Sequence, residues 1–115
     1  MSDEGRVMSE DKAAMSQQEE LIANASRAAE LLKAMSNESR LMVLCCLQDG
    51  ELSVSQINEV VRLSQSALSQ HLAALRAAGL VSTRRDGQTI YYRVQGEAPA
   101  RVLSVLQELF CPTPL

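Results

Sequence analysis

The sequence contains no tryptophan, one phenylalanine and two tyrosines, so aromatic side chains can contribute little to its core. Hydrophobic residues nevertheless make up 46% of the chain, which leaves Leu, Val, Ala and Met to fill the core, a composition that suits packed helices. A chain of 115 residues is long enough for one compact core and too short for two ordinary domains. We therefore expect one mainly α-helical domain.

The sequence also lacks a run of about 18 apolar residues, and its N-terminus is acidic and polar rather than basic and then apolar. No transmembrane helix or signal peptide is predicted, and we expect a soluble, cytoplasmic protein. The chain holds three cysteines, an odd number that does not suit a structural disulfide framework. We expect their thiols to be reduced.

The net charge of -3 is unfavourable for binding nucleic acid, but the charges are unevenly distributed. Residues 1–20 carry six acidic side chains against two basic ones, a balance of -4. Residues 62–93 carry five arginines against one aspartate, a balance of +4. The basic segment is therefore the part expected to meet phosphate, with chance clustering on a solvated face as the alternative.

The first half of the chain is predicted to begin with a tail and two helices. Residues 1–16 are polar and aperiodic, and we expect a disordered tail there. Apolar residues at helical spacing predict an amphipathic helix over residues 17–35. A second helix, apolar on nearly all sides and therefore buried, is predicted from a cap at Ser36 or Asn37 to Gly50.

Two capped helices joined by a short turn follow. Ser53 with Gln56 has the pattern of a capping box and opens a short helix that reaches about Val61. After a tight turn, Ser64 caps a longer helix that Gly79 ends. Two helices connected in this way predict a helix-turn-helix.

Beyond this pair of helices the apolar period changes from 3.6 to two, which predicts strands. The strands are expected at residues 81–85 and 89–94, joined by a hairpin turn at Asp86-Gly87. A hairpin in this position is the wing of a winged helix.

A last amphipathic helix is predicted over residues 97–111, and the prolines that follow leave a short C-terminal tail at 112–115. The predicted fold class is therefore mainly α with a two-stranded β wing. This winged helix-turn-helix domain occupies residues 17–111.

In a helix-turn-helix, the N-terminal residues of the second helix reach base edges in the major groove of DNA. The side chains at that place can all donate or accept hydrogen bonds, and a glutamine paired with adenine contributes about 1 to 3 kcal/mol of discrimination. Beside the hairpin turn, basic and amide side chains can contact the DNA backbone or enter the minor groove. The predicted DNA-binding residues are Gln65, Ser66, Ser69, Gln70, His71, Arg84, Arg85 and Gln88.

Two stretches carry a family resemblance, LLKAMSNESRLMVLCCLQDGELSVSQI and LSQSALSQHLAALRAAGLVSTRRDGQTIYYRV. Together they resemble the ArsR/SmtB family of dimeric bacterial repressors over about residues 20–111. The resemblance implies a homodimer formed through the first and last helices, which binds an inverted repeat in double-stranded operator DNA and leaves it when an inducer is sensed. The two amphipathic terminal helices fit such an interface, and paired recognition helices about one DNA turn apart predict a palindromic operator.

Metal-sensing members of that family use ligands that this sequence lacks. Ser53, Val54 and Ser55 stand where an arsenic- or cadmium-type site needs thiolates, and hydroxyls are poor ligands for soft metals. The last helix has no histidine or aspartate, and the single histidine, His71, lies on the recognition helix. We predict no metal site and no cofactor.

The cysteines resemble those of one subgroup of the family, the sulfide-responsive dithiol repressors. That subgroup has one cysteine in an R-L-x-x-L-C pattern, matched here by residues 40–45, and another at the end of the last helix, matched by Leu109-Phe110-Cys111. The resemblance implies that Cys45 and Cys111 of one subunit lie close together. It further implies that persulfides link them through a disulfide or polysulfide bridge. Cys46 points about 100° away from its neighbour on a helix and is assigned to packing.

Other hypotheses remain open. Three alternatives keep DNA binding but change the signal that controls it. They are peroxide-driven disulfide formation, a metal site outside these patterns, and an anti-repressor without chemical sensing. A winged helix can also serve as a protein-interaction module, and Cys45 can be a small buried side chain without a sensing role. An enzyme is not predicted, because thiol oxidoreductases place C-x-x-C at a helix N-terminus, whereas Cys45-Cys46 lies inside a helix.

Overall fold

The computed structural model describes the backbone of residues 4–111 and the side chains of residues 16–111. The predicted C-terminal tail at 112–115 lies outside this part, as do residues 1–3. The chain forms two compact units with their boundary after Lys33.

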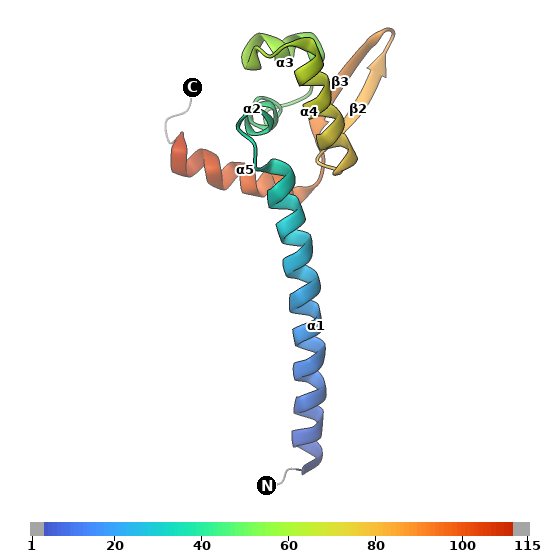
Figure 1. The fold of residues 1–115 in the computed structure, drawn as a ribbon, viewed down its shortest axis with the longest axis vertical. Coiled ribbons are helices and arrows are strands. Elements are labelled where there is room, and N and C mark those ends of the chain that lie inside the picture. The colour runs from blue at the N-terminus through green and yellow to red at the C-terminus, as the bar shows by residue number, and fades with distance from the viewer. Residues whose placement is uncertain (1–3, 112–115) are drawn as a thin grey trace. The chain divides into compact units, whose positions relative to one another are not determined.

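The first helix, α1, spans Glu4–Met35 and is drawn in Figure 1 as one continuous ribbon. It begins well before residue 17, where the apolar period predicted its start. Residues 4–16 lack that period, which is why the sequence suggested a disordered tail. The same residues include no proline and many good helix formers, so they form the first turns of α1 instead.

The second helix, α2, spans Glu38–Cys46 and begins at one of the two predicted caps. The side chain of Asn37 accepts a hydrogen bond from the backbone N–H of Arg40 at 3.1 Å, which satisfies a donor that the first turn of a helix leaves unpaired. Leu44 is fully buried, whereas Cys45 is exposed. Only one side of this helix is therefore in the core, although its sequence is apolar on nearly all sides.

The next two helices, α3 (Val54–Val61) and α4 (Gln65–Ala77), form the predicted helix-turn-helix. Ser53 and Gln56 exchange the two hydrogen bonds of a capping box at the start of α3. The turn before α4 contains Arg62 in a left-handed conformation, with a φ of 56°. The predicted cap and the tight turn are both confirmed.

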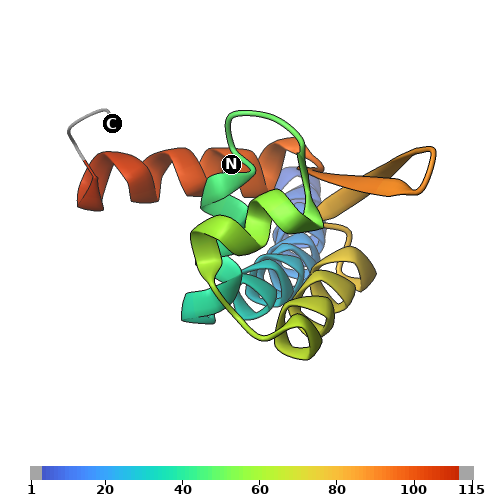
Figure 2. The ribbon, with the colours of Figure 1, turned by 90° about the horizontal axis from the view of Figure 1, so that it is seen from above.

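Three strands form a small antiparallel sheet in the order β1-β3-β2. The predicted hairpin consists of β2 (Val81–Asp86) and β3 (Thr89–Val94), and Figure 2 shows it projecting beyond the neighbouring helices. The third strand, β1 (Leu52–Ser53), pairs with β3 and was not predicted. Two residues are too few to show the alternation that identifies a strand in a sequence.

The hairpin turn lies one residue later than the sequence suggested. Asp86 belongs to β2 and pairs with Thr89, so the turn consists of Gly87 and Gln88. Gly87 has a φ of 65°, a left-handed conformation that glycine adopts without steric cost.

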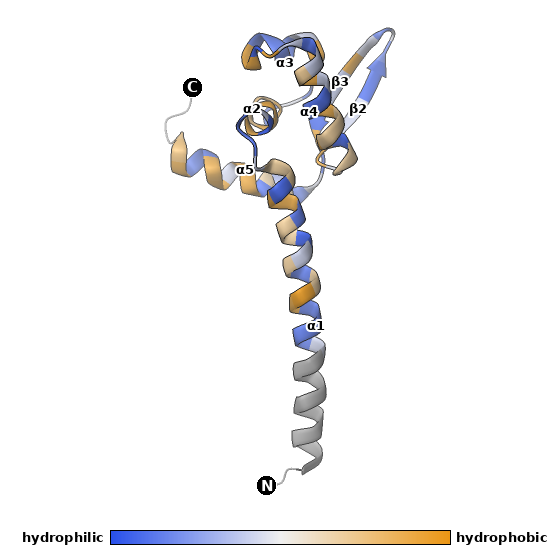
Figure 3. Cartoon of the chain, in the orientation of Figure 1, coloured by the Kyte–Doolittle hydropathy of each residue, from blue (hydrophilic) through white to orange (hydrophobic). Residues whose placement is uncertain are grey.

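The last helix, α5, spans Glu97–Phe110. Apolar residues recur along α5 (Figure 3); Leu103 is buried, whereas Val105, Leu109 and Phe110 are exposed. The buried hydrophobic residues of the described part are Met35, Val43, Leu44, Leu47, Ile57, Val61, Leu68, Leu72, Leu75, Leu80, Val81 and Leu103. This core is aliphatic, as the composition predicted.

Within residues 4–111, none of the helices combines the length and the hydrophobicity needed to cross a membrane.

Candidate nucleic-acid interface and thiol pair

The first turns of α4 present polar side chains to the outside. Ser64 caps the helix, because its hydroxyl accepts a hydrogen bond from the backbone N–H of Ala67 at 3.1 Å. The exposed polar side chains that follow are Gln65, Ser66, Ser69 and Gln70. Leu68, Leu72 and Leu75 are buried, so the apolar face fixes the helix and leaves its polar face free for a partner.

His71 differs from the other predicted DNA-binding residues of α4, because it is half-buried. Its Nδ1 accepts a hydrogen bond from Nε of Arg40 at 3.3 Å, and Nη1 of Arg40 donates to the backbone carbonyl of Ala34 at 3.3 Å. This bond places the proton of a neutral His71 on Nε2. His71 therefore joins α4 to α2, and only Nε2 is left for a contact with DNA.

Arg85 and Gln88 are exposed near the tip of the hairpin, and among the described residues neither makes an ion pair or a side-chain hydrogen bond. Side chains alternate between the two faces of a strand, so the pairing register places Arg85 on the same sheet face as Tyr92. Tyr92 borders a groove of about 460 Å³ beside α4, which Ser69 and Arg76 also line. Arg85 therefore lies on the face of the sheet that is turned toward α4.

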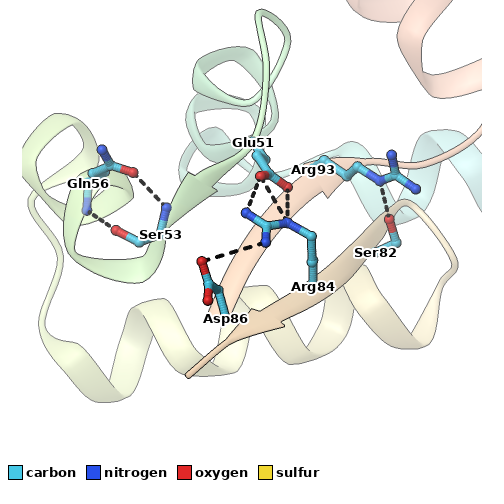
Figure 4. A network of polar contacts seen from close by, with 7 residues as sticks. All are labelled: Glu51, Ser53, Gln56, Ser82, Arg84, Asp86 and Arg93. Carbon is cyan, nitrogen blue, oxygen red and sulfur yellow. Dashed lines mark hydrogen bonds and ion pairs between the residues drawn. The ribbon is translucent and has the colours of Figure 1, made fainter. Parts of the chain in front are cut away.

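Arg84 lies on the opposite sheet face, where its guanidinium is held by other side chains of the chain (Figure 4). Its Nε lies 3.0 and 3.1 Å from the two carboxylate oxygens of Glu51, and its Nη2 lies 2.5 Å from Oε1. The guanidinium carbon lies 4.7 Å from the ring centroid of Tyr91, and Nη1 lies 4.0 Å from Oδ2 of Asp86. Unlike Arg85, Arg84 has its partners within the protein.

The ion pair shifts the titration of both partners. The hydrogen bond from Arg84 lowers the pKa of the Glu51 carboxyl, and the same bond raises the pKa of Arg84. Because the folded-state pKa of Glu51 is depressed, the contribution of the pair is complete above the ordinary glutamate pKa. It is lost only as the pH falls through the lowered value. At neutral pH the pair is therefore intact.

Several residues at this surface were missed by sequence reasoning. Glu51 lies 33 positions from Arg84, and no local pattern connects them. Arg76 and Tyr92 border the groove beside α4, and the only signal for them was that Arg76 belongs to the basic segment. A second groove, of about 520 Å³, lies between the start of α3 and the hairpin and has a lining rich in hydroxyl and amide groups.

Cys45 and Cys111 are free, exposed thiols at the ends of two helices. Cys45 lies in the last turn of α2, and Cys111 follows α5, where its backbone N–H donates to the carbonyl of Gln107 at 2.7 Å. Just beyond α2, Nε2 of Gln48 lies within hydrogen-bonding distance of the Ser104 hydroxyl on α5, at 3.2 Å. The C-terminal end of α2 therefore lies beside α5.

The surroundings of Cys45 disfavour its thiolate. Cys45 is exposed but still partly shielded from water, and this partial burial raises the pKa of its thiol; the negative charge of Cys111 raises it further. Cys46 is half-buried, and its Sγ donates a hydrogen bond to the carbonyl of Val43 at 3.1 Å. Burial and the charge of Cys45 also raise the pKa of Cys46, so Cys46 is held as a packed thiol.

No group of three or more histidine, cysteine, aspartate or glutamate side chains that could hold a metal ion occurs in the described part of the chain. A structural zinc site takes four such ligands. That the protein has no metal site stays a prediction.

A family model described as "Bacterial regulatory protein, arsR family" matches residues 37–83, which run from the cap of α2 into β2. The chain is also 47% identical over 93 residues to the transcriptional activator HlyU of Vibrio cholerae, and the match covers 81% of this chain and 86% of HlyU. Both likenesses include the helix-turn-helix.

Solved structures share the fold. Reduced HlyU from Vibrio cholerae is similar with a TM-score of 0.78 and 48% identity, over 80% of this chain and 97% of HlyU. The transcriptional repressor BigR from Xylella fastidiosa is similar with a TM-score of 0.75 and 37% identity, over 82% of this chain and 96% of BigR. A homodimeric winged helix-turn-helix DNA-binding domain from Mycobacterium bovis is similar with a TM-score of 0.68 and 35% identity, over 76% and 82% of the two chains. The predicted fold class is confirmed.

We predict that iodoacetamide alkylates Cys45 at pH 7 more slowly than an unperturbed cysteine, because only the thiolate attacks and the raised pKa keeps the thiol protonated. At alkaline pH, where thiols ionise, Cys111→Ser removes the nearby negative charge and leaves the partial burial, so the rate at Cys45 should rise. Cys46→Ser is the control and should leave that rate unchanged. Mass spectrometry of the alkylated peptides across a pH series measures these rates, and an unchanged Cys45 rate in Cys111→Ser contradicts the prediction.

Proposed function

The chain belongs to the ArsR family of bacterial regulatory proteins, and on that premise we propose that it is a DNA-binding transcriptional repressor controlled by the thiols of Cys45 and Cys111. The single observation that carries this proposal is the exposed polar face at the start of α4, fixed by a buried leucine face. The relatives named above are transcriptional regulators rather than enzymes.

The start of α4 supports a role as the recognition helix. The amides of Gln65 and Gln70 offer both donors and acceptors to base edges, which is the chemistry that distinguishes base pairs in the major groove. The free N–H groups at a helix N-terminus also favour phosphate. Arg85 and Gln88 extend this surface along the hairpin, where an unpaired arginine can contact the DNA backbone.

Exposed apolar residues support a homodimer formed through the first and last helices. On α5, Val105, Leu109 and Phe110 are 52%, 67% and 77% exposed, and α1 exposes Leu21 and Leu32. Large apolar side chains gathered on exposed helix faces mark surfaces that another chain covers. A two-fold dimer carries two copies of α4, which requires an inverted repeat in the operator.

The thiol pair supports reactive sulfur as the inducer. The thiolate of one cysteine attacks the outer sulfur of a persulfide RSSH, which gives a protein persulfide and releases RSH. The second cysteine then attacks the inner sulfur of that persulfide, which closes a disulfide and releases H2S. Both protein thiols are oxidised and the persulfide is reduced, so the atoms and electrons balance. Each further persulfide consumed before closure inserts one sulfur atom into the bridge and releases one more RSH.

A bridge between Cys45 and Cys111 would act on α4 through α2. The bridge ties the end of α2 to the end of α5, and α2 contacts α4 through the bond between Arg40 and His71. A small rotation of α2 therefore moves α4 within its subunit. Simultaneous contact of two recognition helices with both half-sites is then lost, which releases the DNA.

We predict that Gln70→Ala weakens binding to the duplex that the wild-type protein selects from a random library by about fivefold to 150-fold, because a paired glutamine is worth about 1 to 3 kcal/mol. Binding to unselected duplex should change little. Gln95→Ala, an exposed glutamine beyond the hairpin, is the control and should bind like wild type. Fluorescence anisotropy at fixed salt measures all three. Equal losses on both duplexes, or no loss, contradict a base contact by Gln70.

We predict that Leu109→Asp converts the protein from a dimer to a monomer, because burying an unpaired carboxylate in an apolar interface is costly. Val60→Asp is the matched control, since Val60 is 56% exposed on α3 rather than on the first or last helix, and this variant should remain dimeric. Sedimentation equilibrium gives the mass of each variant. A dimeric Leu109→Asp protein excludes an interface centred on the end of α5.

We predict that glutathione persulfide forms an intramolecular bridge in the reduced protein and abolishes its binding to the selected duplex. Cys45→Ser and Cys111→Ser should each prevent the bridge and keep the DNA bound, whereas Cys46→Ser should behave like wild type. Intact-mass and peptide mass spectrometry identify the bridge, and anisotropy follows the DNA. A bridge that leaves affinity unchanged, or release without a bridge, contradicts thiol control. If the bridge forms only with hydrogen peroxide, the inducer is an oxidant rather than a persulfide.

A further inference from the structure

Two adjacent arginines of the hairpin lie in opposite electrostatic surroundings. The guanidinium of Arg84 is flanked by two carboxylates, those of Glu51 and Asp86, so its positive charge is compensated within the protein. Arg85 has no acidic partner among the described residues. A phosphate approaching Arg84 would meet the two carboxylates as well, whereas Arg85 offers an uncompensated positive charge.

The contacts of Arg84 span the whole width of the sheet. The register aligns Arg84 of β2 with Tyr91 of β3, and Tyr91 with Ser53 of β1. The arginine side chain crosses the ring of Tyr91, with the guanidinium carbon 4.7 Å from its centroid, and reaches Glu51 just before β1. It therefore connects the outer strand of the hairpin to the segment between α2 and β1.

Two contacts fix the orientation of the Arg84 guanidinium. The guanidinium donates from Nε and Nη2 to the Glu51 carboxylate, a paired geometry that fixes the plane of the arginine. The Tyr91 ring below it adds a cation–π contact. The hairpin projects beyond the helices (Figure 2), and the pairing register places Arg84 partway along it, so a contact that holds its strands there affects how its tip is aimed.

We infer that Glu51, Arg84 and Tyr91 form a clamp that holds the hairpin in its DNA-binding position, with Arg84 as a positioning residue and Arg85 as the arginine that contacts DNA. This inference rests on the proposed DNA-binding function. It replaces the sequence-based assignment of both arginines to DNA contact.

The salt dependence of binding separates the two roles. A residue that neutralises a phosphate contributes about 0.9 to the slope of log affinity against log salt. Arg85→Ala should therefore weaken binding and reduce the slope by about 0.9. Arg84→Ala should weaken binding by about two- to fivefold, the range of an exposed ion pair, and leave the slope unchanged. A reduced slope in Arg84→Ala overturns the clamp.

The variant Glu51→Ala gives opposite results under the two roles. If Arg84 positions the hairpin, Glu51→Ala weakens binding about as much as Arg84→Ala, and the double variant is no weaker than either one. If Arg84 contacts phosphate, Glu51→Ala frees it and binding becomes stronger. Glu59→Ala removes an exposed glutamate from α3 and controls for the change in net charge. Binding by Glu51→Ala that is equal to or stronger than that of Glu59→Ala overturns the clamp.

A measurement without DNA distinguishes failure of the clamp from failure of the proposed function. Amide hydrogen exchange in the hairpin should be faster in Glu51→Ala and Arg84→Ala than in wild type and Glu59→Ala. If the wild-type protein selects no duplex, the proposed function fails and this comparison still tests the clamp. Unchanged exchange in the hairpin of both clamp variants overturns it.

Discussion

The orientation of α4 depends on a small core of aliphatic side chains. Leu68, Leu72 and Leu75 of α4 are buried, together with Leu44 of α2 and Ile57 of α3. Without large aromatic side chains to fill space, these five must interlock closely, and a shift of one helix cannot be absorbed by its neighbours. Everything that the polar face of α4 presents to a partner follows from how this core holds its apolar face.

The same packing makes α2 the link between the proposed sulfur chemistry and the proposed DNA binding. One side of α2 contributes Leu44 to the core, and Arg40 on this helix binds His71 of α4. Its C-terminal turn carries Cys45, and the residues just beyond that turn lie beside α5. A single short helix therefore contacts both the proposed sensor and the proposed recognition helix, and its nine residues leave little flexibility between the two ends.

In the hairpin, the alternation of side chains along a strand gives two neighbouring residues different surroundings. Arg84 and Arg85 are adjacent and chemically identical, but the pleat of β2 places them on opposite faces. One face meets Glu51 and Tyr91, and the other is turned toward α4 and the groove lined by Arg76 and Tyr92. Charge alone could not have distinguished them.

The sequence by itself determined the helix-turn-helix, the hairpin and the capping of α2, α3 and α4, because short-range hydrogen bonds and apolar periodicity decide these features. The capping box of Ser53 with Gln56 is an example, since both partners lie within one turn. The family resemblance, rather than any local pattern, singled out Cys45 and Cys111. Apolar periodicity missed the strand β1, whose two residues are too few to show a period, and it placed the start of α1 too late.

Only the tertiary structure decided which polar residues are free for a partner. Glu51 meets Arg84 across 33 positions, and Arg40 meets His71 across 31. Each of these contacts occupies a side chain that the sequence had assigned to DNA. Such pairings depend on how strands and helices from distant segments are brought together, and no local pattern records that.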